Sequence, residues 1–337
     1  MKFHSNYLLI GFLAVSLISI SISCDKDPEE ELIGNWLELS DFEGVARSDA
    51  ASFSIGNLGY VGTGYDGEDR LTDFWAYDSD RNNWTQIAEF PGTARNAAVG
   101  FTAAGKGYVG TGFDGNNRLA DFWAYDPAAN EWTQVADFGG SARYGVVAFS
   151  IDNIGYLGTG FDGNYLKDFW AYNPSTNTWQ QKTSFGGSKR RDAVGFVIGG
   201  MGYICTGINN GAYETEFYMY DPANDLWTAK RKTADVSDED FDNDYSIIRS
   251  NAVAFVLNNK AYVTTGAAPQ LLGSVWEYEP ATDLWEQRTP FEGTARQDAV
   301  AFSTENGRAF VVTGRSSSFS FDDIWEFKPA DPYDKED

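Results

Sequence analysis

Six arginines recur at nearly regular intervals, and they are the residues whose type and spacing could support binding chemistry. Each lies at the start of an apolar segment, as in ARNAAVGF, ARYGVVAF and ARQDAVAF. A guanidinium binds a carboxylate through two parallel hydrogen bonds, so arginines that converge on one opening would form a site for an anionic ligand. The alternative hypothesis is structural pairing with carboxylates such as Asp73, Asp121 and Asp168. The six candidates are Arg47, Arg95, Arg143, Arg190, Arg249 and Arg296.

Three glycine-rich segments, TGYDGEDR, TGFDGNNR and TGFDGNY, each place an aromatic residue beside a carboxylate. An aromatic ring under the apolar face of a sugar, with acceptors for its hydroxyls, suits carbohydrate recognition. Equally, Asp-Gly is a turn sequence, and the ring could pack between neighbouring elements. The later segments TGINNGAYE, TGAAPQLLG and TGRSSSFSF lack the pair, so any such site is expected towards the first three. The candidates are Tyr65, Asp66, Phe113, Asp114, Phe161 and Asp162.

An acidic segment over residues 230–246, KRKTADVSDEDFDNDYS, has a weak similarity to a calcium-binding loop. Asp240, Asp242 and Asp244 alternate as calcium ligands do. However, Tyr245 stands where such a loop has glycine, and Asn251 stands where it has a bidentate glutamate. The favoured interpretation is a solvated or partner-binding loop, with a flap that screens the arginines as a further alternative.

The scarcity of histidine and cysteine excludes several classes of site. His4 is the only histidine, and Cys24 and Cys205 are the only cysteines. If the N-terminal segment is removed, His-based metal sites, Ser-His-Asp catalysis and Cys-His catalysis are excluded, and no cofactor is expected. Cys205 occupies a repeat position filled elsewhere by small residues, which predicts a buried structural thiol. A formal net charge of -24 argues against nucleic-acid partners and adsorption to anionic lipid.

These residues must be positioned by a repeated unit, of which DFWAYDPAANEW is the clearest copy. In five copies a tyrosine is followed seven residues later by a tryptophan, which indicates two short strands joined by a tight turn. The equivalent tryptophans of the repeat, Trp36, Trp84, Trp132, Trp179 and Trp227, are 47 or 48 residues apart, and only the interval from Trp227 to Trp285 is longer, at 58. A period of this length that holds four short strands is typical of a β-propeller blade.

The chain contains six Thr-Gly dipeptides at equivalent positions, beginning at Thr63, Thr111, Thr159, Thr206, Thr265 and Thr313, so six blades are predicted. The first strand, NWLEL, stands alone, and the last, DIWEFKP, has no tryptophan strand after it. We therefore expect the N-terminal strand to complete the last blade and close the ring without an exposed edge. In such blades the b–c loop, between the second and third strands, emerges on the same face as the d–a loop to the next blade. The arginines, at the start of each innermost strand, are accordingly expected to ring the central channel on that face.

These units resemble kelch repeats over nearly the whole chain from Trp36 to Pro329. The arginine before the first strand, the small residues that end the second, the tyrosine in the third and the tryptophan in the fourth all have counterparts. The resemblance implies an all-β, six-bladed propeller over residues 35–330. Galactose oxidase, a copper enzyme of this superfamily, is disfavoured as a guide to function because its copper requires histidines.

The N-terminus is expected to be a signal peptide over residues 1–23, because an apolar run follows Lys2 and is too short to span a membrane comfortably. Cys24 resembles the lipidated cysteine of bacterial lipoproteins, although Ser21 replaces the usual leucine and ordinary signal cleavage is an alternative. Residues 24–34 are then an acidic tether, and residues 331–337 an acidic tail. This predicts a protein lipid-anchored to the outer membrane, facing the cell surface or, alternatively, the periplasm.

The function predicted from these features is non-catalytic binding of an envelope protein or glycan through the face that bears the arginines and the b–c loops. The alternative is an enzyme similar to kelch-type sialic acid mutarotases, which act on an acidic sugar at an arginine-lined mouth and need neither histidine nor metal. A third possibility is a scaffold within a larger surface assembly.

Overall fold

The computed structural model describes residues 1–2, 32–236, 238 and 245–334, and the chain divides into two units, Met1–Glu31 and Leu32–Asp337. Residues 3–23 of the expected signal segment, Cys24 and residues 25–31 of the expected tether lie outside the described residues. So do Asp240, Asp242 and Asp244, the calcium candidates.

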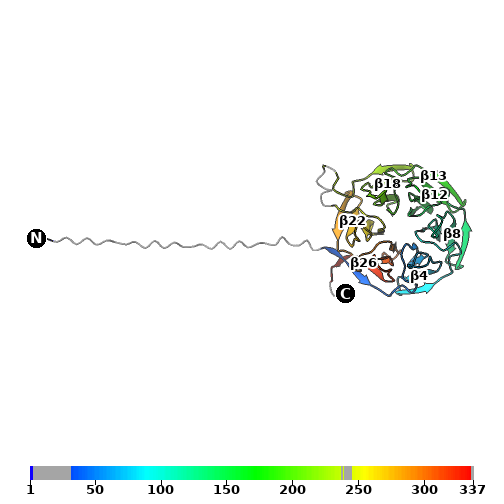
Figure 1. Cartoon of the computed structure of the whole chain (residues 1–337), viewed down its shortest axis with the longest axis horizontal. Helices are drawn as coiled ribbons and strands as arrows, with labels where there is room; N and C mark the ends of the chain where they lie inside the picture. The colour runs from blue at the N-terminus through cyan, green and yellow to red at the C-terminus, as the bar shows by residue number, and fades with distance from the viewer. Residues whose placement is uncertain (3–31, 237, 239–244, 335–337) are drawn as a thin grey trace. The chain divides into compact units, whose positions relative to one another are not determined.

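The described residues of the second unit form six four-stranded antiparallel sheets and one two-stranded sheet. Figure 1 shows the four-stranded sheets arranged as blades around a ring. Blade one contains β2 (Ala51–Ile55), β3 (Leu58–Gly62), β4 (Phe74–Asp78) and β5 (Asn83–Gln86); blade two contains β6 (Val99–Ala103), β7 (Lys106–Gly110), β8 (Phe122–Asp126) and β9 (Glu131–Val135); and blade three contains β10 (Val147–Ile151), β11 (Ile154–Gly158), β12 (Phe169–Asn173) and β13 (Thr178–Lys182).

The second half of the ring has the same order of strands, with a small hairpin added in one loop. Blade four contains β14 (Val194–Ile198), β15 (Met201–Cys205), β18 (Tyr218–Asp221) and β19 (Leu226–Ala229), with β16 (Ile208–Asn209) and β17 (Ala212–Tyr213) in its b–c loop; blade five contains β20 (Val253–Leu257), β21 (Lys260–Thr264), β22 (Val275–Glu279) and β23 (Leu284–Arg288); and blade six contains β24 (Val300–Ser303), β25 (Ala309–Val312), β26 (Ile324–Pro332) and β1 (Ile33–Glu38). The innermost strands contact one another in the closed order β2, β6, β10, β14, β20, β24.

The N-terminal strand completes the last blade, as predicted. β1 pairs antiparallel with β26, and Trp36 lies opposite Phe327. Because β1 is the outermost strand of a sheet whose other three strands come from the C-terminal end, the two ends of the propeller sequence are held in one sheet. β1 begins two residues before the expected start of the domain, and β26 extends two residues beyond its expected end.

The repeated tyrosine and tryptophan act together through the turn between the third and fourth strands. In blade two, Tyr125 Oη donates a hydrogen bond to Asn130 Oδ1 (2.9 Å), and the backbone N–H of Ala88, at the end of blade one, donates to the same oxygen (2.9 Å). Trp132 Nε1 donates in return to the carbonyl of Ala88 (2.9 Å). The same arrangement recurs in blades three and four. The motif therefore fastens each of these blades to the preceding one.

Stacking of blades also depends on a glycine in the second strand. Phe53 of blade one packs over Gly107 of blade two, where an added Cβ would lie 2.1 Å from its ring. The aromatic side chain can approach only because glycine has no side chain. Phe302, Phe101 and Phe149 contact Gly59, Gly155 and Gly202 in the same way.

Candidate functional site

The six repeated arginines are buried within the blades. Arg95, with a side chain 0% exposed, donates from both terminal nitrogens to Asp121 at 2.7 Å, and from Nη1 to the carbonyl of Thr111 at 3.0 Å. Its guanidinium also lies 4.9 Å from the centre of the Phe90 ring. Burial alone would raise the pKa of Asp121, but its hydrogen bonds and ion pair with Arg95 hold that pKa below its ordinary value. Equivalent acidic partners are Asp73 for Arg47, Asp168 for Arg143, Glu216 for Arg190 and Asp323 for Arg296.

Blade five departs from this pattern because Ser274 replaces the carboxylate. Arg249 instead donates to the Ser274 hydroxyl (2.8 Å) and to the carbonyls of Ile247, Thr265 and Ser274. Burial lowers the pKa of Arg249 to about 10. A buried guanidinium can thus be held by neutral oxygens at this position, at an electrostatic cost to the charged form.

The Thr-Gly dipeptides connect each arginine to the next blade. The carbonyl of Thr111 accepts from the side chain of Arg95, and the N–H of Gly112 donates to the carbonyl of Arg143 in blade three (2.8 Å). This second bond recurs around the ring and ends with Gly314 donating to Arg47 (2.9 Å). The expectation that the six guanidiniums ring the channel is therefore corrected. Their own-blade partners hold them inside the blades, as the structural alternative supposes.

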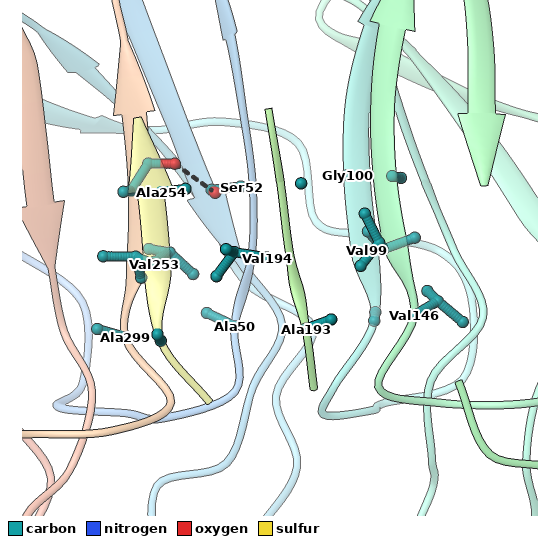
Figure 2. Close-up of a pocket in the computed structure, with 17 residues that line it drawn as sticks. Ala50, Ser52, Val99, Gly100, Val146, Ala193, Val194, Val253, Ala254 and Ala299 are labelled. Atoms are coloured by element: carbon teal, nitrogen blue, oxygen red, sulfur yellow. Dashed lines mark hydrogen bonds between the residues drawn. The ribbon is translucent and has the colours of Figure 1, made fainter. Parts of the chain in front are cut away.

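The channel is lined instead by backbone and small side chains of the innermost strands. Figure 2 shows its middle part, a cavity of about 220 Å³ whose wall includes Ala50, Gly100 and Val194. At the narrower end, the residue two positions after each arginine faces the axis: Asp49, Ala97, Gly145, Asp192, Asn251 and Asp298. All six have positive φ, and backbone hydrogen bonds join several neighbours, including Ala97 to Asp49 (2.9 Å). The positive-φ turn after each repeated arginine therefore brings this later residue, and not the arginine, to the axis of the channel.

Three carboxyl groups, Asp49, Asp192 and Asp298, therefore lie close together around the narrow end. Burial raises the pKa of Asp192 to about 7, although the charge of Arg191 acts in the opposite direction. Burial also raises the pKa of Asp49 and of Asp298, and mutual repulsion adds to the shift at Asp49. Among the described residues there is no group of three or more His, Cys, Asp or Glu side chains that could hold a metal ion.

We predict that Asp192→Asn stabilises the protein at pH 8 and has little effect near pH 4. A carboxyl group whose folded-state pKa is raised stabilises the fold at low pH, and this contribution is lost as the pH rises through about 7. The amide does not ionise, so the gain at pH 8 should be on the order of 2 kcal/mol. Urea unfolding of the two proteins between pH 4 and pH 8 measures it. The neighbouring charged groups Asp49, Asp298, Arg191 and Arg315 are retained in both proteins.

A difference in unfolding free energy that does not vary with pH would contradict this prediction. Asp221→Asn is the matched control. The pKa of Asp221 is lowered by its hydrogen bonds, first of all that from Asn224. The control should therefore give no gain above pH 7.

The aromatic and acidic residues of the first three b–c loops lie on the loop face, which is the end of the propeller formed by residues 63–73, 111–121, 159–168, 206–217, 265–274 and 313–323. The carboxylates are used in turns: Asp66 Oδ1 accepts from the N–H groups of Glu68 and Asp69 at 2.8 and 2.7 Å. Asp114 and Asp162 accept in the same manner. These bonds correspond to the turn interpretation of the motif.

The aromatic rings stack with arginines that the sequence patterns did not single out. Arg70 lies between Tyr65 and Phe113, 5.2 Å from each ring centre. Arg118 lies 5.2 Å from the centre of the Phe161 ring, and Arg191 lies 5.9 Å from it. The rings are partly buried and form a continuous layer with these cations across blades one to four, so they are not separate exposed platforms.

The largest of the described cavities on the loop face lies between blades six and one, and we call it the seam groove. Its volume is about 840 Å³, within the usual range for ligand sites. Phe319 and Val45 are its most exposed apolar residues, at 61% and 56%. The groove is lined by Val45, Ala46, Ser48, Asp49, Tyr65, Asp66, Gly67, Glu68, Arg70, Asn96 and residues 315–320. The groove thus combines residues of blade one with residues 315–320 of blade six, outside the three blades towards which the sequence directed attention.

A second cavity on the loop face, of about 470 Å³, lies between blades three and four. It is lined by Phe161, Gly163, Asn164, Tyr165, Lys189, Asn209 and Asn210.

Cys205 is a structural residue of the core. Its side chain is fully buried, and burial raises the pKa of the thiol to about 12, so the thiol stays protonated.

Sequence reasoning missed Arg315 and the axial carboxylates Asp49, Asp192 and Asp298. Arg315 and the three carboxylates each occupy a defined position of the repeat. Arg315 follows the Thr-Gly pair of blade six, where blades one to three have the aromatic residue. The carboxylates each stand two residues after a repeated arginine. Comparing equivalent positions of all six repeats would have shown these departures.

Comparison with known proteins agrees with the repeat and the fold. A family model described as the kelch motif matches residues 112–139 and 158–186. Together with the six sheets and the closing strand, this decides the architecture. The protein is a six-bladed β-propeller that contains kelch motifs. The solved structure titled "Structure of YjhT" is similar to the propeller, with a TM-score of 0.69 and 16% sequence identity, over 85% of this chain and 96% of that one.

This similarity to a solved structure shows the fold of the propeller alone. A search of curated proteins finds no match to the chain. Within its described residues, no helix is both long and apolar enough to cross a membrane.

Proposed function

We propose that the protein is a non-catalytic binding propeller of the cell envelope that recognises a glycan or protein partner through its loop face. The observation that carries this proposal is the seam groove. It combines two aromatic side chains, Tyr65 and Phe319, with hydroxyl, amide, carboxylate and guanidinium groups. Rings for apolar contact and several polar groups for hydrogen bonds are the chemistry that a saccharide requires. This combination favours a glycan over a protein as the partner.

The remaining loop-face chemistry is consistent with binding. The second cavity offers Phe161 and Tyr165 beside three asparagine side chains. Among the described residues there is no histidine, and the one cysteine is buried and protonated. The strong negative charge of the chain disfavours nucleic acid as a partner. We further propose that Cys24 carries a lipid that anchors the propeller to the outer membrane.

Replacing Phe319 by alanine is expected to weaken saccharide binding about tenfold, because the ring is the most exposed apolar surface in the groove. Calorimetric titration of the full-length chain in detergent with neutral and acidic sugars measures this effect. Leu226→Ala is the matched control, since Leu226 is similarly exposed, at 54%, but lies at the start of β19 outside the groove. Equal weakening by the two variants, or an unchanged affinity in Phe319→Ala, would show that the groove is not the site.

The enzymatic alternative has one specific observation in its favour. The Asp192 carboxyl, with a pKa of about 7 and Arg191 at 3.1 Å, is suited to proton transfer near neutral pH. The six buried arginines no longer support an arginine-lined mouth, so the alternative depends on Arg191, Arg315 and the axial carboxylates. Anomer exchange of an acidic sugar, followed by NMR, separates it from binding: a rate equal to that in buffer excludes the enzyme.

A further inference from the structure

We propose that the seam groove binds a saccharide that carries a carboxylate, and that Arg315 is the residue that binds this group. The inference rests on the proposed function and specifies the ligand class of the same site. Uronic acids are the simplest sugars with this chemistry. The proposal assigns recognition of the anionic group to Arg315, which is not among the six repeated arginines.

Arg315 differs from those six in both exposure and partners. Its side chain is 42% exposed, whereas theirs are at most 1% exposed. Its Nε donates to Asp298 Oδ2 at 2.8 Å, but within the described part of the chain neither terminal nitrogen has a protein hydrogen-bond partner. Arg315 lines the seam groove, so its terminal nitrogens supply N–H donors at a site that also contains hydroxyl and aromatic side chains. This is the arrangement that binds a carboxylate in bidentate fashion.

The guanidinium is held in position before any ligand arrives. The side chain of Asp298 is 2% exposed, and its other oxygen, Oδ1, accepts from Asn251 Nδ2 at 2.5 Å. The backbone of Arg315 is also fixed, because it exchanges two hydrogen bonds with Gln297, at 3.0 and 2.9 Å. An arginine with fixed Nε and backbone loses less conformational entropy on binding than one on a free loop.

The position is specific to blade six. Bridges between the d–a and b–c loops make the residue after Thr-Gly equivalent in all blades, as Ser48 pairs with Tyr65 and Gln297 pairs with Arg315. The equivalent residues of the other blades are Tyr65, Phe113, Phe161, Ile208 and Ala267. One of six repeats thus presents a cation where the others present an apolar side chain. Arg315 pairs with the buried Asp298 of its own blade, but this ion pair uses only Nε and leaves the two terminal nitrogens for a ligand.

The surroundings of Arg315 favour a saccharide over a polyanion. Ser316, Ser317, Ser318 and Ser320 line the same groove and supply hydroxyl groups. Glu68 supplies an acceptor for sugar hydroxyls, and the Tyr65 and Phe319 rings supply apolar contact. A phosphate-rich chain would be repelled by the overall charge of the protein, which is -24, whereas a single carboxylate needs only one local cation to bind it.

The test compares D-glucuronate with D-glucose, which differ only at C6, a carboxylate in the first and a hydroxymethyl group in the second, by calorimetric titration of the full-length chain in detergent. The wild type is expected to bind glucuronate about tenfold more tightly than glucose. Arg315→Gln should remove this preference, so that the two sugars bind with similar affinity. Arg315→Lys keeps the charge without the paired donors and should give an intermediate preference. Arg81→Gln, at an 81% exposed arginine of the turn between β4 and β5, should leave the preference intact.

Each remaining outcome is decisive. Equal binding of the two sugars by the wild type overturns the carboxylate inference and leaves the proposed function standing. A preference that survives in both Arg315 variants assigns the carboxylate to another residue and overturns the role of Arg315. Binding of neither sugar overturns this inference, and if the neutral and acidic panel also fails, the glycan function fails with it. Circular dichroism of each variant establishes that it is folded, and Arg315→Lys serves if Arg315→Gln is not.

Discussion

Asp121→Ala is expected to destabilise the propeller by about 3–5 kcal/mol, because it leaves the guanidinium of Arg95 buried without its counter-ion. Arg95 is 0% exposed, and both of its bonds to Asp121 are 2.7 Å long. Asp121 also accepts from Trp123 Nε1 at 2.8 Å, so the variant breaks three hydrogen bonds. Urea unfolding at pH 7 measures the loss. It should shrink as the pH falls, because the lowered pKa of Asp121 makes its contribution one that is lost in acid.

Blade five supplies the control for this prediction. Asp121→Ser copies the Arg249–Ser274 pairing, in which a hydroxyl accepts from the guanidinium at 2.8 Å. It should therefore cost less than Asp121→Ala, since a neutral acceptor is retained. The reverse change, Ser274→Asp, should stabilise the protein and restore an acceptor for Trp276 Nε1, which has no hydrogen-bond partner among the described residues. A loss below about 1 kcal/mol for Asp121→Ala would contradict the account of the buried pair.

Trp36→Ala is expected to cost about 3–5 kcal/mol and to loosen the closure of the ring. Trp36 is 0% exposed and packs against Phe291, Phe327 and Phe255, with ring centres 4.9, 4.7 and 6.2 Å away. It is the principal core residue of β1, the strand that joins the two ends of the propeller. Its removal should therefore expose β26 as well as weaken packing between blades five and six. Urea unfolding and hydrogen exchange of the β26 amides measure the two effects.

Ile33→Ala is the matched control in the same strand. Ile33 is 48% exposed, so the change should alter stability by less than about 0.5 kcal/mol and leave exchange in β26 as it is in the wild type. Unchanged β26 exchange in Trp36→Ala would show that closure of the ring does not depend on this side chain.

Much of the fold could be predicted because the information is local and repeated. The tyrosine-tryptophan period gives the blade, the six Thr-Gly pairs give the number of blades, and the unpaired strands at the two ends give the closure. The tyrosine-tryptophan pair occurs five times, the Thr-Gly pair occurs six times, and the unpaired strands lie at the two ends of the propeller sequence. The two-stranded hairpin in the b–c loop of blade four was not predicted, since Ile208–Asn209 and Ala212–Tyr213 are too short to show a periodic pattern.

The candidate site could be predicted only in part. The sequence located the loop face and the residues on it, including Tyr65 and Asp66 of the seam groove. It could not show that the groove joins blade one to residues 315–320 of blade six, because that proximity exists only once the ring is closed. It directed attention to blades one to three because only their b–c loops place an aromatic residue beside a carboxylate.

The sequence by itself therefore determined the architecture of this protein: a ring of six kelch-like blades, closed by its first strand, with an arginine at the same point of every blade. Only the tertiary structure decided what those arginines do. Two residues after Arg95, Ala97 takes a positive φ of 51°, and the corresponding turn in every blade brings that later residue to the axis while the guanidinium meets its own-blade partner. Spacing in a sequence fixes where a residue lies along the chain. The direction of a side chain at a turn depends on the backbone around it and on which charged group it can reach, so burial and pairing decide between a binding site and a structural ion pair.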